Sequence, residues 1–120
     1  MQSRKHFTLV EIMIVMAIIG LLAAIAIPSF VRARTTSQKN ACINNLRQID
    51  GAKEQWALET NQASTATPDA NEINPYIKGT SAKCICPSDS GKAFTSSYTI
   101  GTMTADPLCR IVPGAGNHAL

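Results

Sequence analysis

The strongest constraint on this chain is an apolar run from Phe7 to Val31 that contains a single charged side chain, Glu11. In an α-helix, about 25 residues span roughly 37 Å, whereas the hydrocarbon core of a bilayer is about 30 Å thick. The run is therefore long enough to cross a membrane. The remaining residues are mostly polar and include few aromatic side chains, so they form one small domain at most.

A helical pattern continues beyond the apolar run. Apolar side chains recur at helical spacing along one face, at Ala41, Cys42, Leu46, Ile49, Ala52 and Trp56. Lys53 falls inside this stripe, where its aliphatic stem is expected to lie along the apolar surface. No proline occurs between Pro28 and Thr60. We therefore expect one helix over residues 7–59, apolar on all sides in 7–31 and amphipathic in 32–59.

Residues 60–120 are expected to form a small globular head. A polar loop, Thr60–Ala70, precedes a short helical turn that Asp69 caps. Turn residues then separate three candidate strands, Lys83–Cys86, Ala93–Ile100 and Leu108–Val112. The predicted fold class is α+β, with a long N-terminal helix packed against a small C-terminal antiparallel sheet.

The location of the charges excludes some function classes. The net charge is +3, but residues 36–120 carry equal numbers of basic and acidic side chains. The excess lies in residues that flank the apolar run, Arg4, Lys5, Arg32 and Arg34, where basic side chains anchor a helix at membrane interfaces. No nucleic-acid binding is expected. The chain also has no nucleophile motif or phosphate-binding loop, so neither an enzyme nor a cofactor is expected.

Glu11 has two possible roles. A carboxylate in an apolar membrane helix is costly unless it is neutral, paired or functional. It lies near one end of the run, so it can simply reach the water at the membrane surface. Alternatively, it can pair with a positive charge from another chain, which would fix the register between neighbouring helices.

The segment Phe7-Thr8-Leu9-Val10-Glu11-Ile12-Met13-Ile14-Val15, running on to Gly20 and Pro28, resembles the N-terminal signal segment of type IV pilins and type II secretion pseudopilins. The resemblance covers about the first 30 residues. It implies that residues 1–6 are a leader, that a prepilin peptidase cuts between His6 and Phe7, and that Phe7 is then N-methylated. It also implies that Glu11 recognises the terminal amine of an adjacent subunit during assembly.

The same resemblance implies a place in the cell and a set of partners. The helix would sit in the inner membrane with the head outside the cytoplasm, and the subunit would then enter a periplasmic or cell-surface filament. The partners would be further subunits, the peptidase and an inner-membrane assembly platform. Gly20 presents a small surface to neighbouring helices, and Pro28 removes a helical hydrogen bond. In assembled filaments of this kind the stretch between these positions can lose its helical structure.

Two alternatives stay open. The family usually has glycine, or sometimes alanine, immediately before the cut, whereas this chain has His6. Without cleavage the chain would remain a single-pass membrane-anchored protein. The small-residue sequence Ala24-Ile25-Ala26 also resembles a secretory cleavage site, so a secreted binding module beginning at Ile27 is the other alternative. The residues do not distinguish a major pilin from a minor pilin or a pseudopilin.

The head contains four cysteines, Cys42, Cys84, Cys86 and Cys109, which permit three sets of two disulfides. Export to an oxidising compartment favours disulfides. The Cys86-Pro87 turn and the later Cys109 resemble the C-terminal loop of short pilin-like proteins, which implies a Cys86–Cys109 bond. A Cys42–Cys84 bond is the weaker prediction, because Cys42 on the packed stripe equally suits a small buried apolar residue.

No zinc site is expected at the cysteines. Cys84 and Cys86 are too close in sequence for the usual zinc-ligand spacing, and His118 is the only histidine after the leader. Asp89 and Asp106 are weak calcium candidates, by resemblance to major pseudopilins. An aspartate in a Ser/Gly-rich turn is more simply explained by the turn itself.

Overall fold

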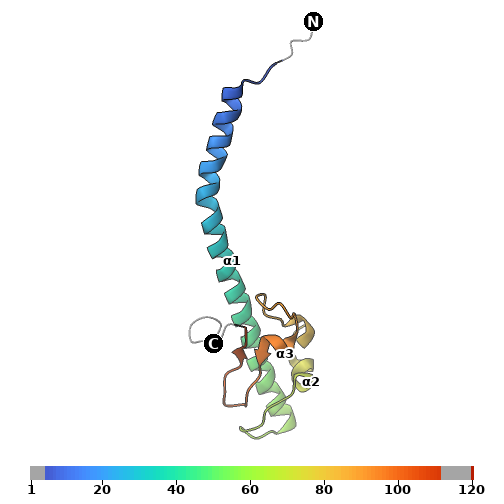
Figure 1. The fold of residues 1–120 in the computed structure, drawn as a ribbon. Coiled ribbons are helices and arrows are strands. Elements are labelled where there is room, and N and C mark those ends of the chain that lie inside the picture. The colour runs from blue at the N-terminus through green and yellow to red at the C-terminus, as the bar shows by residue number, and fades with distance from the viewer. Residues whose placement is uncertain (1–4, 112–119) are drawn as a thin grey trace. The chain divides into compact units, whose positions relative to one another are not determined.

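A computed structural model describes residues 5–111 and residue 120. The chain divides into two compact units, Met1–Thr35 and Thr36–Leu120. One helix, α1, runs from Leu9 to Thr60 and contributes to both (Figure 1). The predicted helix over residues 7–59 is therefore confirmed to within two residues at its start and one at its end.

The end of α1 has a specific local cause. Asn61 adopts a left-handed conformation with φ of 51°, and the Gln62 N–H donates to the Ala57 carbonyl oxygen at 3.1 Å. These two features define a Schellman motif, which satisfies carbonyl groups that the last turn leaves without a partner. The Thr60 hydroxyl also donates to the Trp56 carbonyl oxygen at 2.6 Å.

The helical residues of the first unit have exposed apolar side chains on every side. The large apolar residues between Phe7 and Val31 are all at least half exposed, and Ile25 is 75 % exposed. Among the described residues, α1 is the one helix that is long and apolar enough to cross a membrane. An apolar surface of this extent is expected to be covered by lipid or by other chains.

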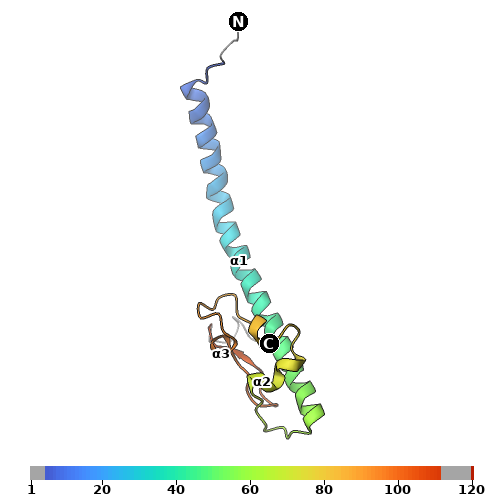
Figure 2. The same ribbon diagram turned by 90° about the vertical axis from the view of Figure 1, so that its right-hand side faces the viewer.

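The second unit builds its core on the amphipathic half of α1. The buried side chains of this half are Cys42, Leu46, Ile49, Ala52, Lys53 and Trp56, which confirms the predicted stripe. Two short helices, α2 (Ala70–Ile73) and α3 (Phe94–Ser97), lie beside this part of α1 in both views (Figures 1 and 2). They contribute Ile73 and Phe94 to the same core.

The predicted helical turn after Asp69 is confirmed. The Asp69 N–H donates to the Glu72 carboxylate at 2.7 Å, as in a capping box at the start of α2. A 3₁₀ turn, η1 (Asn74–Tyr76), follows directly and contains Pro75. The preceding loop is exposed over most of its length, as its polar composition predicts.

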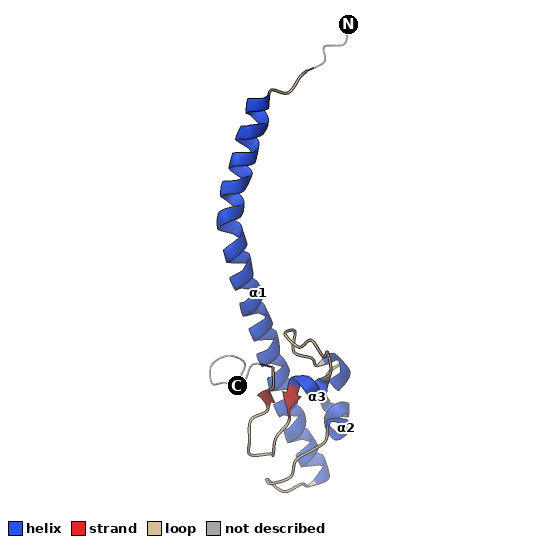
Figure 3. Ribbon diagram, in the orientation of Figure 1, coloured by secondary structure: helices blue, strands red, loops and turns tan. Residues whose placement is uncertain are grey.

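The predicted strands were wrong in length: over the part of the chain that the structure describes, one of the three is absent, and each of the other two contains only two strand residues. Most of the head consists of loops and short helices (Figure 3). The segment predicted as the first strand begins in a 3₁₀ turn, η2 (Ser81–Lys83), and continues without regular structure to Cys86. Within residues 5–111, only β1 (Tyr98–Thr99) and β2 (Leu108–Cys109) are strands; they pair antiparallel, with Tyr98 opposite Cys109. Val112, at the end of the third predicted strand, lies outside the described residues.

Residues 94–97 form helix α3 instead of a strand because tertiary contacts favour a turn there. The Ser97 N–H donates to the Ala93 carbonyl oxygen at 3.0 Å, and the Ser96 and Ser97 hydroxyls both donate to Asp89. The helical turn also brings the Phe94 and Tyr98 rings to a centroid distance of 5.9 Å. An alternating strand would point these rings to the same face but would not place both serines on one carboxylate.

Candidate functional site

The first turn of α1 is organised by Thr8 and Glu11. Thr8 precedes the first helical residue, and its backbone N–H and its hydroxyl donate to Glu11 Oε2 at 2.7 and 2.8 Å. In return, the Glu11 N–H donates to the Thr8 hydroxyl oxygen at 3.3 Å. This reciprocal pattern is a capping box, in which two backbone donors at a helix start are satisfied by side chains.

The sequence contains a signal for this cap that the prediction did not use. Threonine followed three residues later by glutamate, ahead of an apolar run, is the usual pattern of a capping box. Glu11 therefore has a role within its own chain besides the predicted contact with another one. Among the described residues, the two hydrogen bonds that its carboxylate accepts from Thr8 both use Oε2, which leaves Oε1 for a donor from another chain.

The predicted cleavage site lies ahead of this cap. His6 and Phe7 are exposed and belong to a segment without regular structure, and the Phe7 side chain is 83 % exposed. An extended, exposed peptide bond is the form in which a peptidase can bind its substrate. The first four residues of the leader lie outside the described part of the chain.

Gly20 and Pro28 both lie within α1, which is assigned as helix through both positions. A Cβ atom added at Gly20 would meet nothing within 4 Å, so nothing in the single chain requires glycine there. The predicted loss of helical structure between the two residues concerns the assembled filament, and it stays a prediction.

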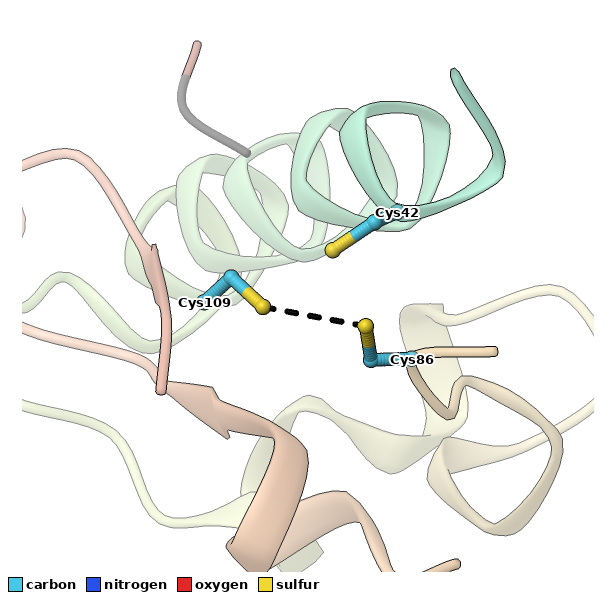
Figure 4. Close-up of side chains that lie close together, drawn as sticks. All are labelled: Cys42, Cys86 and Cys109. Atoms are coloured by element: carbon cyan, nitrogen blue, oxygen red, sulfur yellow. Dashed lines mark hydrogen bonds between the residues drawn. The ribbon is translucent and has the colours of Figure 1, made fainter. Parts of the chain in front are cut away.

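Three of the four cysteines come together in the head. Cys42 on α1, Cys86 in the loop after η2, and Cys109 on β2 are buried, and their sulfur atoms all lie within 4.8 Å of one another (Figure 4). The Cys109 thiol donates to the Cys86 sulfur at 3.7 Å. The pair predicted to form a disulfide is thus in contact, and the bond itself stays a prediction.

Cys84 points to a different place from the other three cysteines. Its sulfur donates to the Asn45 carbonyl oxygen at 3.9 Å, and burial raises the pKa of its thiol to about 11. Burial raises the pKa of Cys42 and of Cys86 as well. The thiols of Cys42, Cys84 and Cys86 are therefore protonated at neutral pH.

Asp89 is occupied by the turn that contains it. Its carboxylate accepts from the Ser96 hydroxyl at 2.5 Å, the Ser97 hydroxyl at 2.7 Å and the Gly91 N–H at 2.8 Å. These hydrogen bonds, that of Ser96 first, lower the pKa of Asp89. Asp106 is exposed. This arrangement supports the turn explanation of Asp89, and calcium binding at the two aspartates stays a prediction.

Lys53 is the buried charge whose role the sequence did not reveal. Its side chain is fully buried, and its ammonium donates to the carbonyl oxygens of Ile100, Thr102 and Ala105 at 3.2, 3.0 and 2.6 Å. It also lies 3.7 Å from the Asp50 carboxylate. The predicted packing of its stem is correct, but nothing in the sequence pattern indicates that the ammonium organises the loop between β1 and β2.

Residues 7–27 match the family described as the prokaryotic N-terminal methylation motif. Over this segment the chain is similar to the proteins that carry that motif. The match begins at Phe7, the residue predicted to follow the cut, and it includes Glu11 and Gly20. The resemblance to type IV pilins and pseudopilins is thereby confirmed for the N-terminal part of the chain.

Curated relatives extend the similarity beyond this segment. The chain is 43 % identical over 69 residues to the type IV major pilin protein PilA of Myxococcus xanthus, covering 58 % of this chain and 30 % of that protein. It is 42 % identical over 69 residues to a fimbrial protein of Pseudomonas aeruginosa, covering 57 % and 45 %. It is 29 % identical over 84 residues to the type II secretion system core protein G of Klebsiella pneumoniae, covering 65 % and 60 %.

The chain thus spans less than two thirds of the length of each of these relatives. Their names describe a type IV major pilin, a fimbrial protein and a core protein of a type II secretion system. No solved structure matches the chain.

Proposed function

We propose that this protein is the precursor of a structural subunit of a type IV pilus-like or type II secretion pseudopilus filament. The observation that carries the proposal is a helix whose apolar part is exposed on every side and begins with a single carboxylate one turn after Phe7. The prepilin segment over residues 7–27 and the pilin relatives support it. The role is structural rather than enzymatic.

The apolar part of α1 has two successive environments in this proposal. Before assembly it anchors the precursor in the inner membrane as a single span, with the head outside the cytoplasm. In the filament it packs against the same part of other subunits, in the periplasm or at the cell surface. Once the helix has left the bilayer, keeping one large apolar side chain out of water contributes about 1.5–3 kcal/mol, so a helix with many of them opposes dissociation of the polymer into water.

Glu11 and Phe7 supply the specific contact between subunits. Cleavage between His6 and Phe7 by a prepilin peptidase creates a terminal amine, which is then N-methylated and still carries a positive charge. Glu11 keeps one carboxylate oxygen available beside the cap formed by Thr8. A charge pair in an apolar environment is strongly attractive, so it would set the axial position of each new subunit on the inner-membrane assembly platform.

The first test is the mass and N-terminal sequence of the full chain, extracted from membranes of cells that also express a prepilin peptidase. We expect a chain that begins with N-methylated Phe7. A chain that begins with Met1 would show that the protein is an unprocessed membrane anchor. A chain that begins with Ile27 would identify a secreted module and rule out the filament.

The second test concerns assembly. The Glu11→Ala variant is expected to be cleaved and inserted normally but to give no filaments in sheared-cell fractions, because its pairing with the Phe7 amine is lost. Glu54→Ala is the matched control, since Glu54 lies exposed on the amphipathic half of α1. Filaments formed equally by both variants would contradict the proposed role of Glu11.

A further inference from the structure

The cysteine cluster of Cys42, Cys86 and Cys109 contains one sulfur more than a disulfide uses. The three sulfurs come from three different elements and lie within 4.8 Å of one another in the buried interior of the head (Figure 4). Cys42 is 0 % exposed, Cys86 1 % and Cys109 5 %. The cluster is thus a sulfur-rich site from which water is almost excluded.

Hydrogen bonds outside the cluster fix the backbone at Cys86. The Cys86 N–H donates to the Ser97 hydroxyl oxygen at 3.1 Å, and the Ser97 hydroxyl donates to Asp89 at 2.7 Å. The Asp89 N–H in turn donates to the Cys86 carbonyl oxygen at 2.9 Å. This closed ring of contacts holds the Cys-Pro turn independently of any bond between sulfurs.

The other two cysteines are positioned by regular structure. Cys109 is opposite Tyr98 in the β1–β2 pair, and the neighbouring Arg110 N–H donates to the Ser97 carbonyl oxygen at 2.8 Å. Cys42 lies on α1, one turn before Asn45, whose side-chain amide donates to the Tyr98 hydroxyl at 2.9 Å. All three sulfurs are therefore held in place before any ligand binds, which favours metal coordination.

We propose that Cys42, Cys86 and Cys109 bind one zinc ion in the reduced protein. Two sulfurs bound to a tetrahedral zinc at about 2.3 Å each are about 3.8 Å apart, and the Cys86 and Cys109 sulfurs are 3.7 Å apart. Thiolate ligands favour zinc over hard ions such as magnesium and calcium, which prefer oxygen ligands. The three cysteines supply three of its four positions, and the Cys84 sulfur does not supply the fourth because it is directed at the Asn45 carbonyl oxygen.

The charge and proton balance of this step is simple. Zn²⁺ binds as the three thiols release three protons, which gives a site with a net charge of −1 and no change in oxidation state. Burial raises the pKa of Cys42 and Cys86, so these two thiols keep their protons at neutral pH in the absence of zinc. Zinc binding therefore weakens as the pH falls, because protons compete for the same sulfurs.

The predicted Cys86–Cys109 disulfide is the competing use of the same atoms. It would use two of the three sulfurs and prevent zinc binding, and the Cys42 sulfur would take no part in it. Cys42 therefore distinguishes the two chemistries, since zinc requires it and the disulfide does not. Cys84 and Cys86 are too close in sequence for the usual zinc-ligand spacing, but Cys42, Cys86 and Cys109 come from three distant segments, to which that limit does not apply.

The test uses the full chain, purified in detergent with a phosphine reductant and dialysed against Zn²⁺ at neutral pH. Zinc content is measured by elemental analysis, and affinity by competition with a chromophoric chelator. We expect one zinc per chain in the wild type and in Cys84→Ser, the control for a buried cysteine outside the cluster. Cys42→Ser is expected to bind zinc more than about 100-fold more weakly, beyond the loss produced by an outer-shell contact.

Thermal unfolding adds a readout that does not require Cys42→Ser to fold. Zinc is expected to raise the Tm of the wild type and of Cys84→Ser, because a ligand that binds only the folded state stabilises it. A reduced wild type that takes up no zinc would overturn the proposal, whether or not Cys42→Ser folds. Equal zinc binding by Cys42→Ser would overturn it as well. None of these outcomes depends on filament assembly.

Discussion

Lys53 donates hydrogen bonds to three carbonyl oxygens from a fully buried position, so its removal should destabilise the head. Lys53→Met keeps the aliphatic stem but leaves those oxygens without their donor. We expect the free energy of unfolding to fall by about 3 kcal/mol, since hydrogen bonds from a charged group contribute about 1.5–3 kcal/mol and buried unpaired acceptors carry a penalty. Urea unfolding followed by the fluorescence of Trp56, the single tryptophan, measures the change.

The matched control for Lys53 is Lys78→Met, which removes the same charge from an exposed position. Its free energy of unfolding should stay within about 0.5 kcal/mol of the wild type, as is usual for surface substitutions. If both variants unfold at the same urea concentration, the three hydrogen bonds contribute little and the loop between β1 and β2 is held by other contacts.

Asp89 should make the stability of the head depend on pH in the acidic range. Its hydrogen bonds lower its pKa in the folded protein. Such a group contributes stability above its unfolded pKa of about 3.9, and this contribution is lost as the pH falls through the lower, folded value. Asp89→Asn should therefore be less stable than the wild type at pH 7, and the difference should shrink below about pH 4.

Melting curves of the wild type and Asp89→Asn across this pH range provide the measurement. Asp106→Asn serves as the control, because Asp106 is an exposed aspartate of the same head. A gap between Asp89→Asn and the wild type that stays constant down to the lowest pH would show that the ionised carboxylate is not the stabilising form.

These residues also show where sequence alone is insufficient. Lys53 violated the apolar pattern of its helix face, and the pattern gave no information about which carbonyl groups would surround the ammonium, because they belong to residues 100–105. The meeting of Cys42 with Cys86 and Cys109 has the same origin. Contacts between distant segments depend on the tertiary fold, whereas the Thr8–Glu11 cap is local and was visible in the sequence.

At the scale of elements, the capping box should control the first turn of α1. Thr8→Ala removes the hydroxyl that accepts from the Glu11 N–H. Loss of an N-cap side chain costs about 1 kcal/mol, so hydrogen exchange of the Glu11 amide should accelerate about fivefold in detergent micelles. Thr35→Ala is the control, since the Thr35 hydroxyl bonds to the Val31 carbonyl oxygen within the helix. Equal exchange in both variants would contradict the capping role.

The elements differ in how well local sequence determines them. Helix α1 was predicted closely because its periodicity persists over many turns and its end has turn-forming residues. The strands were overpredicted because residues 93–100 have the composition of a strand but form helix α3 and only two strand residues. There the decisive interaction is Asp89 with two serines, which strand propensity does not represent.

At the scale of the whole molecule, the exposed apolar part of α1 requires an environment that excludes water, and processing decides which one. Without cleavage, that environment is the membrane. In the proposed function, cleavage creates an amine at Phe7 that pairs with the Glu11 carboxylate, and this pair would allow the helix to leave the bilayer for a polymer, since it offsets the cost of an isolated carboxylate in an apolar core. Under this proposal, cleavage of a single peptide bond would convert a membrane anchor into a filament subunit.

His6 should therefore limit how much of the protein reaches the filament. It occupies the position before the predicted cut, where the imidazole is far larger than the glycine or alanine that the resemblance implies. We expect His6→Gly to raise the fraction of mature chain several-fold after a short pulse of expression with a prepilin peptidase, as measured by intact mass. Gln2→Gly is the control for added leader flexibility and should match the wild type. If His6→Gly is processed no faster, the peptidase accepts histidine at this position, and another step limits maturation.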